Sequence, residues 1–199
     1  MDQETDNNKK KLDSQDEILL AALKLFAEKG YFNTSLSDIA EAVGLKTTSS
    51  IYQHFKNKQT IASALYADIL DSLSISIDDI RRRNKKPSEQ LREIVGLLFR
   101  LTQTAPNVMT FLLVMNRHEF LPEEKPLLET APFVKILKII QTGIRFEEIR
   151  GTDPLQAYMY FFGIINQTLR MALAGSLAKN VEAYQSQVWM TAWNAICKK

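Results

Sequence analysis

Two short segments with helical apolar spacing, separated by a glycine, constrain the fold of this chain more than any other feature. The first segment has apolar residues at i, i+3, i+4 and i+7, namely Leu36, Ile39, Ala40 and Val43, which is the pattern of a short helix with one buried face. Ser35 and Asp38 fit the capping box that begins such a helix, and Gly44 permits the sharp turn that ends it. A second short helix is expected to run through Phe55, with Ile51 and Phe55 facing inward. The pair predicts a helix-turn-helix, whose second helix would lie in the major groove of DNA.

The rest of the chain also carries helical rather than strand patterns. Seven glycines and six prolines among 199 residues are few for a β-rich fold, which needs many turns. Helices are predicted over residues 14–30, 36–43, 50–55, 58–82, 91–104, 107–117, 133–148, 154–177 and 181–197. We therefore expect an all-α protein of about nine helices, in which an N-terminal three-helix helix-turn-helix domain is fused to a C-terminal helical domain for regulation and dimerisation.

Charge and periodicity suggest the domain boundaries. Residues 1–13 are polar without periodicity, so we expect a disordered N-terminal arm, with Ser14 in a capping box that begins the first helix. We expect a DNA-binding domain over 14–67 and a ligand-binding and dimerisation domain over 68–199. The long fourth helix belongs to both and fuses them. The lysines 9–11 of the arm are expected to belong to a solubilising tail, with DNA contact as the alternative.

The charge distribution favours nucleic acid in one stretch only. The formal net charge of the whole chain is +2, which does not by itself indicate nucleic-acid binding. Between Glu41 and Asp68, however, there is no acidic residue, while Lys46, Lys56 and Lys58 are present. Because a carboxylate would repel the DNA backbone, an acid-free basic stretch is what a phosphate-facing surface requires.

Residues 18–70 resemble the N-terminal domain of the tetracycline-repressor (TetR) family almost throughout. The resemblance rests on Ala22, Leu25, Phe26, Gly30, Tyr31, Thr34, Ser35, Ile39, Ala40, Gly44, Ile51, Tyr52, His54, Phe55, Lys58 and Leu65. One departure concerns the turn, because the family usually has one residue fewer between the turn glycine and the tyrosine than lie between Gly44 and Tyr52 here. The turn is therefore expected to be one residue longer, which leaves open which of Lys46, Thr47, Thr48 and Ser49 reaches the bases.

The resemblance and the residue chemistry together imply the DNA contacts. Tyr52, Thr34 and Lys58 are expected to bind phosphates, which set the register without reading sequence. Gln53 is the expected base reader, because a carboxamide can pair with adenine through two hydrogen bonds. The predicted set is Thr34, Ser35, Lys46, Thr47, Thr48, Ser49, Ser50, Tyr52, Gln53, His54 and Lys58. The alternatives are core packing for Tyr52, a partly buried and hydrogen-bonded His54, and merely solvated surface lysines.

The apolar segment 154–177 predicts a dimer. Residues 143–175 resemble the region that precedes and forms the family's dimer helix. The predicted helix has more apolar surface than one core face needs, so we expect a symmetric homodimer through residues 154–177 and 181–197. The predicted interface residues are Tyr158, Phe161, Ile165 and Trp189. A helix at the centre of a monomer is the alternative.

Methionines and phenylalanines in the C-terminal domain suggest an adaptable apolar cavity for a small apolar or amphipathic effector. The predicted ligand-binding residues are Phe99, Met109, Phe111, Met115, Asn116, His118, Gln141, Phe162, Asn166 and Arg170. Ordinary core packing is the alternative for each apolar residue, and a pairing across the dimer is the alternative for Arg170.

Other classes of protein are disfavoured. The chain shows no glycine-rich phosphate loop and no serine nucleophile elbow, so we expect no enzyme, catalytic residue or cofactor. With Cys197 as its only cysteine and two distant histidines, we expect no metal site and a reducing, cytoplasmic location. No secretory signal is visible, and the polar residues within 158–177 argue against a membrane span.

The expected function is a ligand-responsive bacterial transcriptional regulator, more specifically a repressor. It would bind a palindromic operator in double-stranded DNA as a homodimer and be released by its effector. A nucleoid-associated or scaffolding DNA binder on the same fold, acting through a protein partner, is the alternative.

Overall fold

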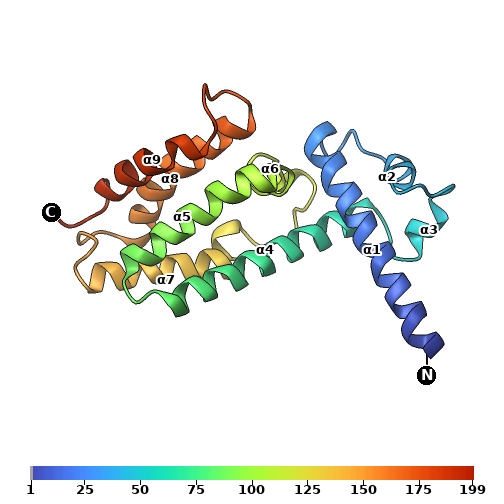
Figure 1. Ribbon diagram of the computed structural model, residues 1–199, viewed down its shortest axis with the longest axis horizontal. Coiled ribbons are helices and arrows are strands. Elements are labelled where there is room, and N and C mark those ends of the chain that lie inside the picture. Colours follow the sequence, from blue (N-terminus) through green and yellow to red (C-terminus); the bar gives the residue numbers. More distant parts are fainter. Residues whose placement is uncertain (1) are drawn as a thin grey trace. The chain divides into compact units, whose positions relative to one another are not determined.

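The computed structural model describes the backbone of residues 2–199 and the side chains of residues 14–199. Over this range the chain is all-α, which confirms the predicted fold class. Its elements, in chain order, are α1 (Asp2–Lys29), α2 (Leu36–Ala42), α3 (Ser49–Tyr52), α4 (Lys58–Arg83), α5 (Pro87–Thr104), α6 (Pro106–Leu113), the short 3-10 helices η1 (Arg117–Glu119) and η2 (Leu127–Glu129), α7 (Ala131–Arg145), α8 (Pro154–Leu173) and α9 (Glu182–Asn194) (Figure 1). In the described part of the chain the only β-type pairing is an isolated antiparallel bridge between Ile149 and Cys197.

The chain divides into two compact units. An N-terminal unit extends to Asp68 and also takes in Met115–Glu124, and a C-terminal unit comprises Ile69–Val114 and Lys125–Lys199. Helix α4 therefore contributes residues to both units. The presence of Met115–Glu124 in the N-terminal unit is a feature that no local sequence pattern predicts.

Helix α1 begins earlier than the sequence suggests. It runs from Asp2, so Ser14 lies inside the helix rather than at its N-cap, and the segment predicted to be a disordered arm has helical backbone. Residues such as Glu, Gln and Lys are good helix formers, so a polar segment without apolar periodicity can still be helical. The side chains of lysines 9–11 lie outside the described residues.

Helices α1, α2 and α3 and the first part of α4 enclose the core of the N-terminal unit, whose buried side chains include Ile18, Ala22, Phe26, Ile39, Ile51 and Ile61. The predicted capping box begins α2, because the backbone N–H of Asp38 donates to Ser35 Oγ (3.1 Å) and that of Ser35 donates to the Asp38 carboxylate (2.7 Å). Gly44 has a φ of +71°, a left-handed conformation that favours glycine and ends the helix.

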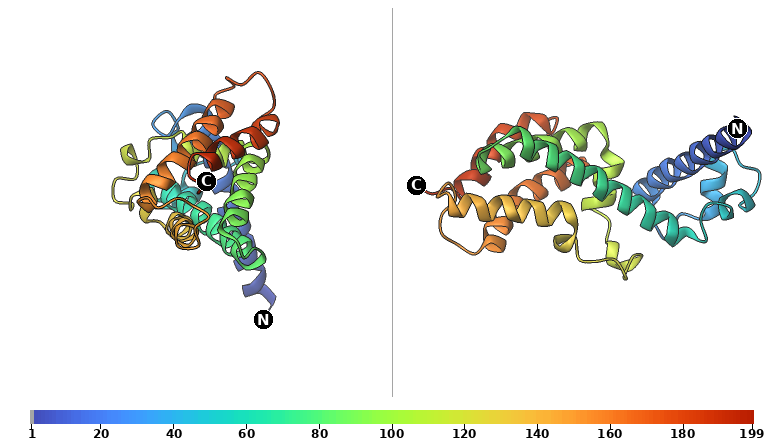
Figure 2. Two further views of the ribbon diagram at one scale, coloured as in Figure 1. Left: turned by 90° about the vertical axis from the view of Figure 1, so that its left-hand side faces the viewer. Right: turned by 90° about the horizontal axis from the view of Figure 1, so that it is seen from below.

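In the C-terminal unit, α5, α7, α8 and α9 run alongside one another (Figure 2). Their shared core includes Ile94, Phe99, Ile140, Phe161, Ile165 and Leu169. Helix α8 begins as predicted, with the Asp153 carboxylate accepting the backbone N–H of Gln156 (3.0 Å) and Pro154 following the cap. It ends at Leu173, before the predicted limit, since Gly175 takes a φ of +66°.

Helix α4 alone, among the described residues, is long and apolar enough to cross a membrane by length and composition. Its apolar side chains, such as Ile61, Leu65 and Ile77, are buried inside the units. A core helix passes the same length and composition test, and this is how we interpret α4.

Candidate nucleic-acid interface

The chain from α3 into the following turn alternates between buried anchors and exposed polar groups. Ile51 is fully buried and Phe55 is 6% exposed, which anchors this segment in the N-terminal core. Tyr52 and Gln53, which follow Ile51, are exposed, Tyr52 to 57%. The Tyr52 ring therefore faces solvent, and the alternative of core packing is wrong for this residue.

Most of the predicted DNA contacts share this surface. Lys46, Thr47, Ser49, Tyr52 and Gln53 are exposed, and Thr48 and Ser50 are partly exposed. No acidic residue interrupts the chain here, and the set combines an amine, hydroxyls, a phenol and a carboxamide, which are the groups that bind phosphates and base edges. His54 is only partly exposed, and its Nδ1 is buried without a hydrogen-bond partner among the described residues.

Lys58 has a structural role instead of the predicted phosphate contact. Its Nζ donates hydrogen bonds to the carbonyl oxygens of Tyr31 and Thr34, both at 2.7 Å, and lies 4.2 Å from the centroid of the Tyr31 ring. Partial burial lowers the pKa of Lys58 from its ordinary value, with the Asp38 carboxylate acting in the opposite direction. The ammonium group therefore ties the loop between α1 and α2 to the start of α4, because two of its three donors are used inside the unit.

Thr34 and Ser35 are likewise engaged within the protein. Thr34 is 1% exposed, and its hydroxyl donates to the carbonyl oxygen of Gly30 (2.9 Å), so the predicted phosphate contact by this side chain is wrong. The Ser35 hydroxyl donates to the Asp38 carboxylate (2.6 Å), and this hydrogen bond holds the pKa of Asp38 below its usual value. A carboxylate that stays ionised beside Ser35 would repel a DNA phosphate, which counts against a phosphate contact there.

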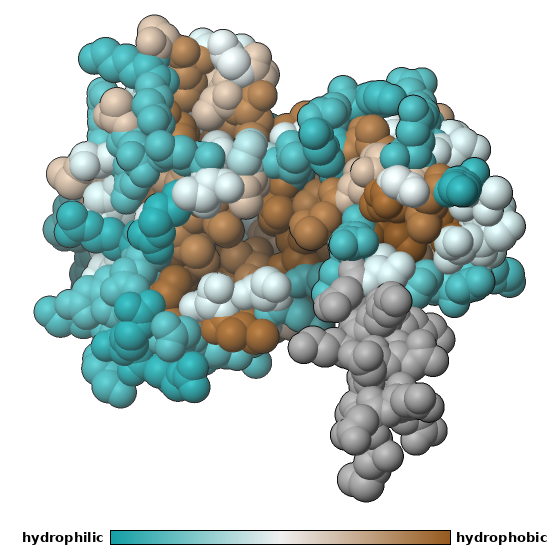
Figure 3. All heavy atoms as spheres, turned by 45° about the vertical axis from the view of Figure 1, so that its right-hand side comes forward, coloured by the Kyte–Doolittle hydropathy of each residue, from teal (hydrophilic) through white to brown (hydrophobic). Residues whose placement is uncertain are grey.

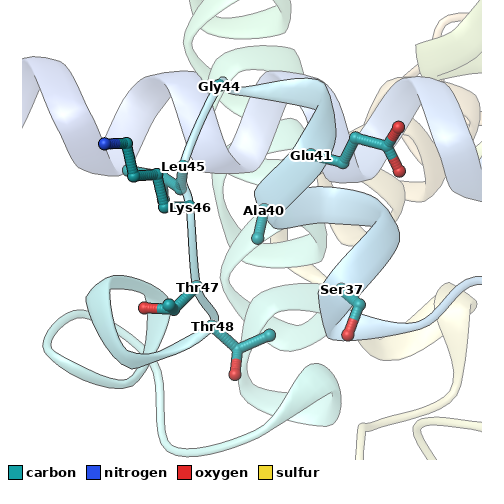
Figure 4. A pocket seen from close by; sticks show the side chains of 8 residues that line it. All are labelled: Ser37, Ala40, Glu41, Gly44, Leu45, Lys46, Thr47 and Thr48. Carbon is teal, nitrogen blue, oxygen red and sulfur yellow. The ribbon is translucent and has the colours of Figure 1, made fainter.

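A hollow of about 430 Å³ opens between α2 and the turn that follows it (Figure 4). One wall consists of Ser37, Ala40 and Glu41 on α2, and the other is the turn, residues 44–48. The turn is long and α3 has only four residues, which leaves this face of α2 partly uncovered. Ser37 is not among the DNA contacts predicted from the sequence. Ser37, Ala40, Glu41 and Gly44 nevertheless stand at positions i, i+3, i+4 and i+7, which share one helix face.

The predicted ligand-binding residues fall into two groups. The apolar residues Phe99, Met109, Phe111 and Phe162 are buried in the C-terminal unit, and Asn166 on α8 is partly buried. The polar residues Asn116, His118, Gln141 and Arg170 are exposed, and Met115, Asn116 and His118 belong to the N-terminal unit. The prediction that these polar side chains orient a ligand inside the C-terminal core is therefore wrong. Among the side chains that the structure describes, no group of three or more His, Cys, Asp or Glu could hold a metal ion.

The predicted dimer interface needs a correction as well. Tyr158, Phe161 and Ile165 are at most 8% exposed because their own chain covers them. Trp189 packs edge-on against Phe161 at a centroid distance of 5.8 Å, but it is partly exposed and stays a predicted interface residue. A residue buried within one protomer cannot form the contact surface of a second. The exposed large apolar side chains of α8 are instead Leu155, Met159, Tyr160 and Met171, and Met190 is exposed on α9. On the face drawn in Figure 3, hydrophobic side chains are interspersed with hydrophilic ones.

Residues 115–124 pack within the N-terminal unit. Phe120 is 5% exposed and stacks on Tyr31, with ring centroids 4.6 Å apart. The Arg117 guanidinium lies 4.8 Å from the centroid of the Tyr66 ring, and burial raises the pKa of the Tyr66 hydroxyl. The sequence gives no signal for these contacts, because the partners are far apart along the chain.

Comparisons with known proteins agree with this architecture. The sequence model described as "Bacterial regulatory proteins, tetR family" matches residues 18–65. The "Fatty acid metabolism regulator protein" of Bacillus subtilis is 26% identical over 156 residues, which are 77% of this chain and 80% of that protein.

Two solved structures extend the likeness to nearly the whole chain. A TetR family transcription regulator from Marinobacter aquaeolei has a TM-score of 0.76 at 20% identity and covers 98% of this chain and 100% of its own. The transcriptional regulator FadR from Bacillus subtilis, in complex with stearoyl-CoA, has a TM-score of 0.67 at 23% identity and covers 90% of this chain and 98% of its own. At these identities the two structures support the fold.

Proposed function

We propose that this chain, a TetR-family transcriptional regulator by the match of its residues 18–65, is a cytoplasmic repressor that binds a palindromic operator as a homodimer and is released by a small amphipathic effector. The observation that carries the proposal is the exposed pair Tyr52 and Gln53, held out by the buried Ile51 and Phe55 in an acid-free stretch. Such an arrangement presents a phosphate ligand and a base-reading carboxamide from one rigid segment.

Substitutions at this pair should separate sequence reading from general affinity. Gln53→Ala should cost about 1–3 kcal/mol of operator binding and relax sequence preference. Tyr52→Phe should weaken binding to matched and scrambled duplexes alike, because a phosphate contact carries no sequence information. Fluorescence anisotropy at one fixed salt concentration would measure both, with Gln59→Ala, an exposed glutamine on α4, as the matched control. Equal affinity of the unchanged chain for matched and scrambled duplexes would contradict operator binding.

The proposed homodimer is supported by the outer face of α8. Leu155, Met159 and Gly163 recur every four residues and so share one helix face, and Leu155 and Met159 are 42% and 59% exposed. Met190, 55% exposed, adds apolar surface on the neighbouring α9. Exposed apolar surface of this kind is stabilised when a second copy covers it, and a two-fold dimer is the commonest arrangement.

We expect Met159→Lys to convert the dimer to a monomer without unfolding the chain, because it places an unpaired charge in an apolar contact. Phe146→Lys is the matched control, since Phe146 is 61% exposed and lies outside α8 and α9. Sedimentation velocity would give the number of chains, and circular dichroism would report retained helix. A Met159→Lys protein that still sedimented as a dimer would place the interface elsewhere.

The proposed amphipathic effector is supported by the core of the C-terminal unit. Phe99, Met109, Phe111 and Phe162 are each at most 2% exposed, and the unbranched Met109 side chain can adapt to an inserted apolar group. The Bacillus subtilis relative is named a fatty acid metabolism regulator, and the FadR structure contains stearoyl-CoA. A long-chain acyl thioester is therefore the first compound to titrate against the operator complex.

A further inference from the structure

The hollow between α2 and the turn lies at the start of the recognition helix. Thr48, which lines it, comes directly before α3. In helix-turn-helix proteins the first residues of the recognition helix are the ones that contact base edges. The hollow therefore lies beside the point at which a base pair would meet the protein, provided that the proposed operator binding holds.

The side chains of the hollow present methyl and hydroxyl groups rather than charges. In Figure 4 the Ala40 methyl and the Thr48 methyl face the gap, and the Ser37 hydroxyl lies at its open end. The Lys46 ammonium and the Glu41 carboxylate both point away from it. Ala40 is 3% exposed, so it lies behind the hollow, and the partly exposed Thr48 supplies the methyl group that a base can reach.

This chemistry fits one base better than the others. Thymine alone presents a methyl group in the major groove, next to the O4 acceptor, and apolar contacts from alanine and threonine methyls are a known way of reading it. A phosphate would be bound most strongly by a cation, and the one lysine of the hollow points elsewhere. We propose that this hollow is a thymine-reading site, in which the thymine 5-methyl packs against the Thr48 methyl and the Ser37 hydroxyl donates to O4. Helix α2 then takes part in reading sequence through Ser37.

The test begins with an operator selected by the full-length chain from random duplexes. Each thymine is then replaced singly by deoxyuridine, which keeps base pairing and O4 but lacks the 5-methyl group, and affinity is measured by anisotropy. We expect one thymine in each half-site at which uracil weakens binding roughly fourfold, the effect of one lost methyl contact. Operators whose thymines all tolerate uracil would overturn the inference.

Threonine-to-serine variants locate the contact. Thr48→Ser removes the methyl group and keeps the hydroxyl. The loss of affinity caused by uracil at that position should then shrink, because the effects of removing the two partners of one contact are not additive. Thr47→Ser is the matched control, since the Thr47 hydroxyl points away from the hollow, and it should keep the full penalty. Ser37→Ala should lower the preference for thymine over cytosine at the same position.

A penalty that Thr48→Ser leaves unchanged would place the methyl contact outside the hollow and overturn the proposal. A preference for cytosine at this position that depends on Glu41 would overturn it too, because a carboxylate accepts from cytosine N4. A chain that selected no sequence at all would instead contradict the proposed operator binding, which is a different result from a selected operator without a methyl effect.

Discussion

Replacing Lys58 with methionine is expected to lower the free energy of unfolding of the N-terminal unit by about 2–4 kcal/mol, because it removes two charge-assisted hydrogen bonds in a partly solvated site. Methionine keeps an unbranched stem that can pack along α4, but it leaves the carbonyl oxygens of Tyr31 and Thr34 without the donors that Nζ now supplies at 2.7 Å. The loss of its charge over the Tyr31 ring adds to the effect.

Tryptophan fluorescence and hydrogen exchange report the unfolding of the two units separately. Both tryptophans, Trp189 and Trp193, lie in the C-terminal unit, so their fluorescence reports its unfolding. Hydrogen exchange of peptides from residues 18–65 reports the N-terminal unit. Lys58→Met should raise exchange there and leave the fluorescence transition nearly unchanged, while Lys56→Met, an exposed lysine two residues earlier, should change neither. If Lys58→Met left exchange unaltered and only reduced the salt dependence of DNA binding, the phosphate role predicted from the sequence would be right after all.

Lys58 also illustrates where sequence reasoning stops. The helix-turn-helix was predictable because its signals are local: apolar spacing, the Ser35–Asp38 capping box and the glycine at the turn all lie within a few residues of one another. The partners of Lys58 are 27 and 24 residues away, and nothing in the spacing states that the loop at 31–34 returns to the start of α4. From the sequence alone, a lysine in a basic stretch predicts a phosphate ligand, whether its side chain points to solvent or is hydrogen-bonded within the protein.

The proposed dimer face shows the same limit of sequence-based prediction. The sequence predicts the excess apolar surface of α8, because apolar residues around more than one face of a helix have to be covered by other elements. Which residues face outward depends on how the neighbouring helices pack. Helices α5, α6, α7 and α9 all contact α8, and Tyr158, Phe161 and Ile165 are buried whereas Leu155 and Met159 stay exposed. The i, i+4, i+8 spacing of Leu155, Met159 and Gly163 was present in the sequence, but it is less apolar than the stripe that forms the core.

Phe120→Ala is expected to destabilise the N-terminal unit by about 3–5 kcal/mol, the usual effect of removing a buried phenylalanine, although residue 120 lies far along the chain from the helix-turn-helix. Phe120 is 5% exposed and stacks on Tyr31, whose ring also lies under the Lys58 ammonium. Hydrogen exchange over residues 18–65 should rise, and the tryptophan transition should stay in place.

Phe111→Ala is the matched control, because Phe111 is 2% exposed but belongs to the C-terminal unit, so it should shift the tryptophan transition instead. The reverse pattern would mean that residues 115–124 stabilise the C-terminal unit.

Phe120→Ala also tests how the effector acts. The segment 115–124 is continuous at both ends with C-terminal residues and packs within the N-terminal unit, so under the proposed function we expect it to transmit effector binding to the operator contacts. With an acyl thioester that releases the unchanged chain from its operator, we expect a typical coupling of about 5- to 150-fold. Phe120→Ala should still bind that effector while this ratio falls toward one, and a ratio that stayed the same would remove the segment from the route.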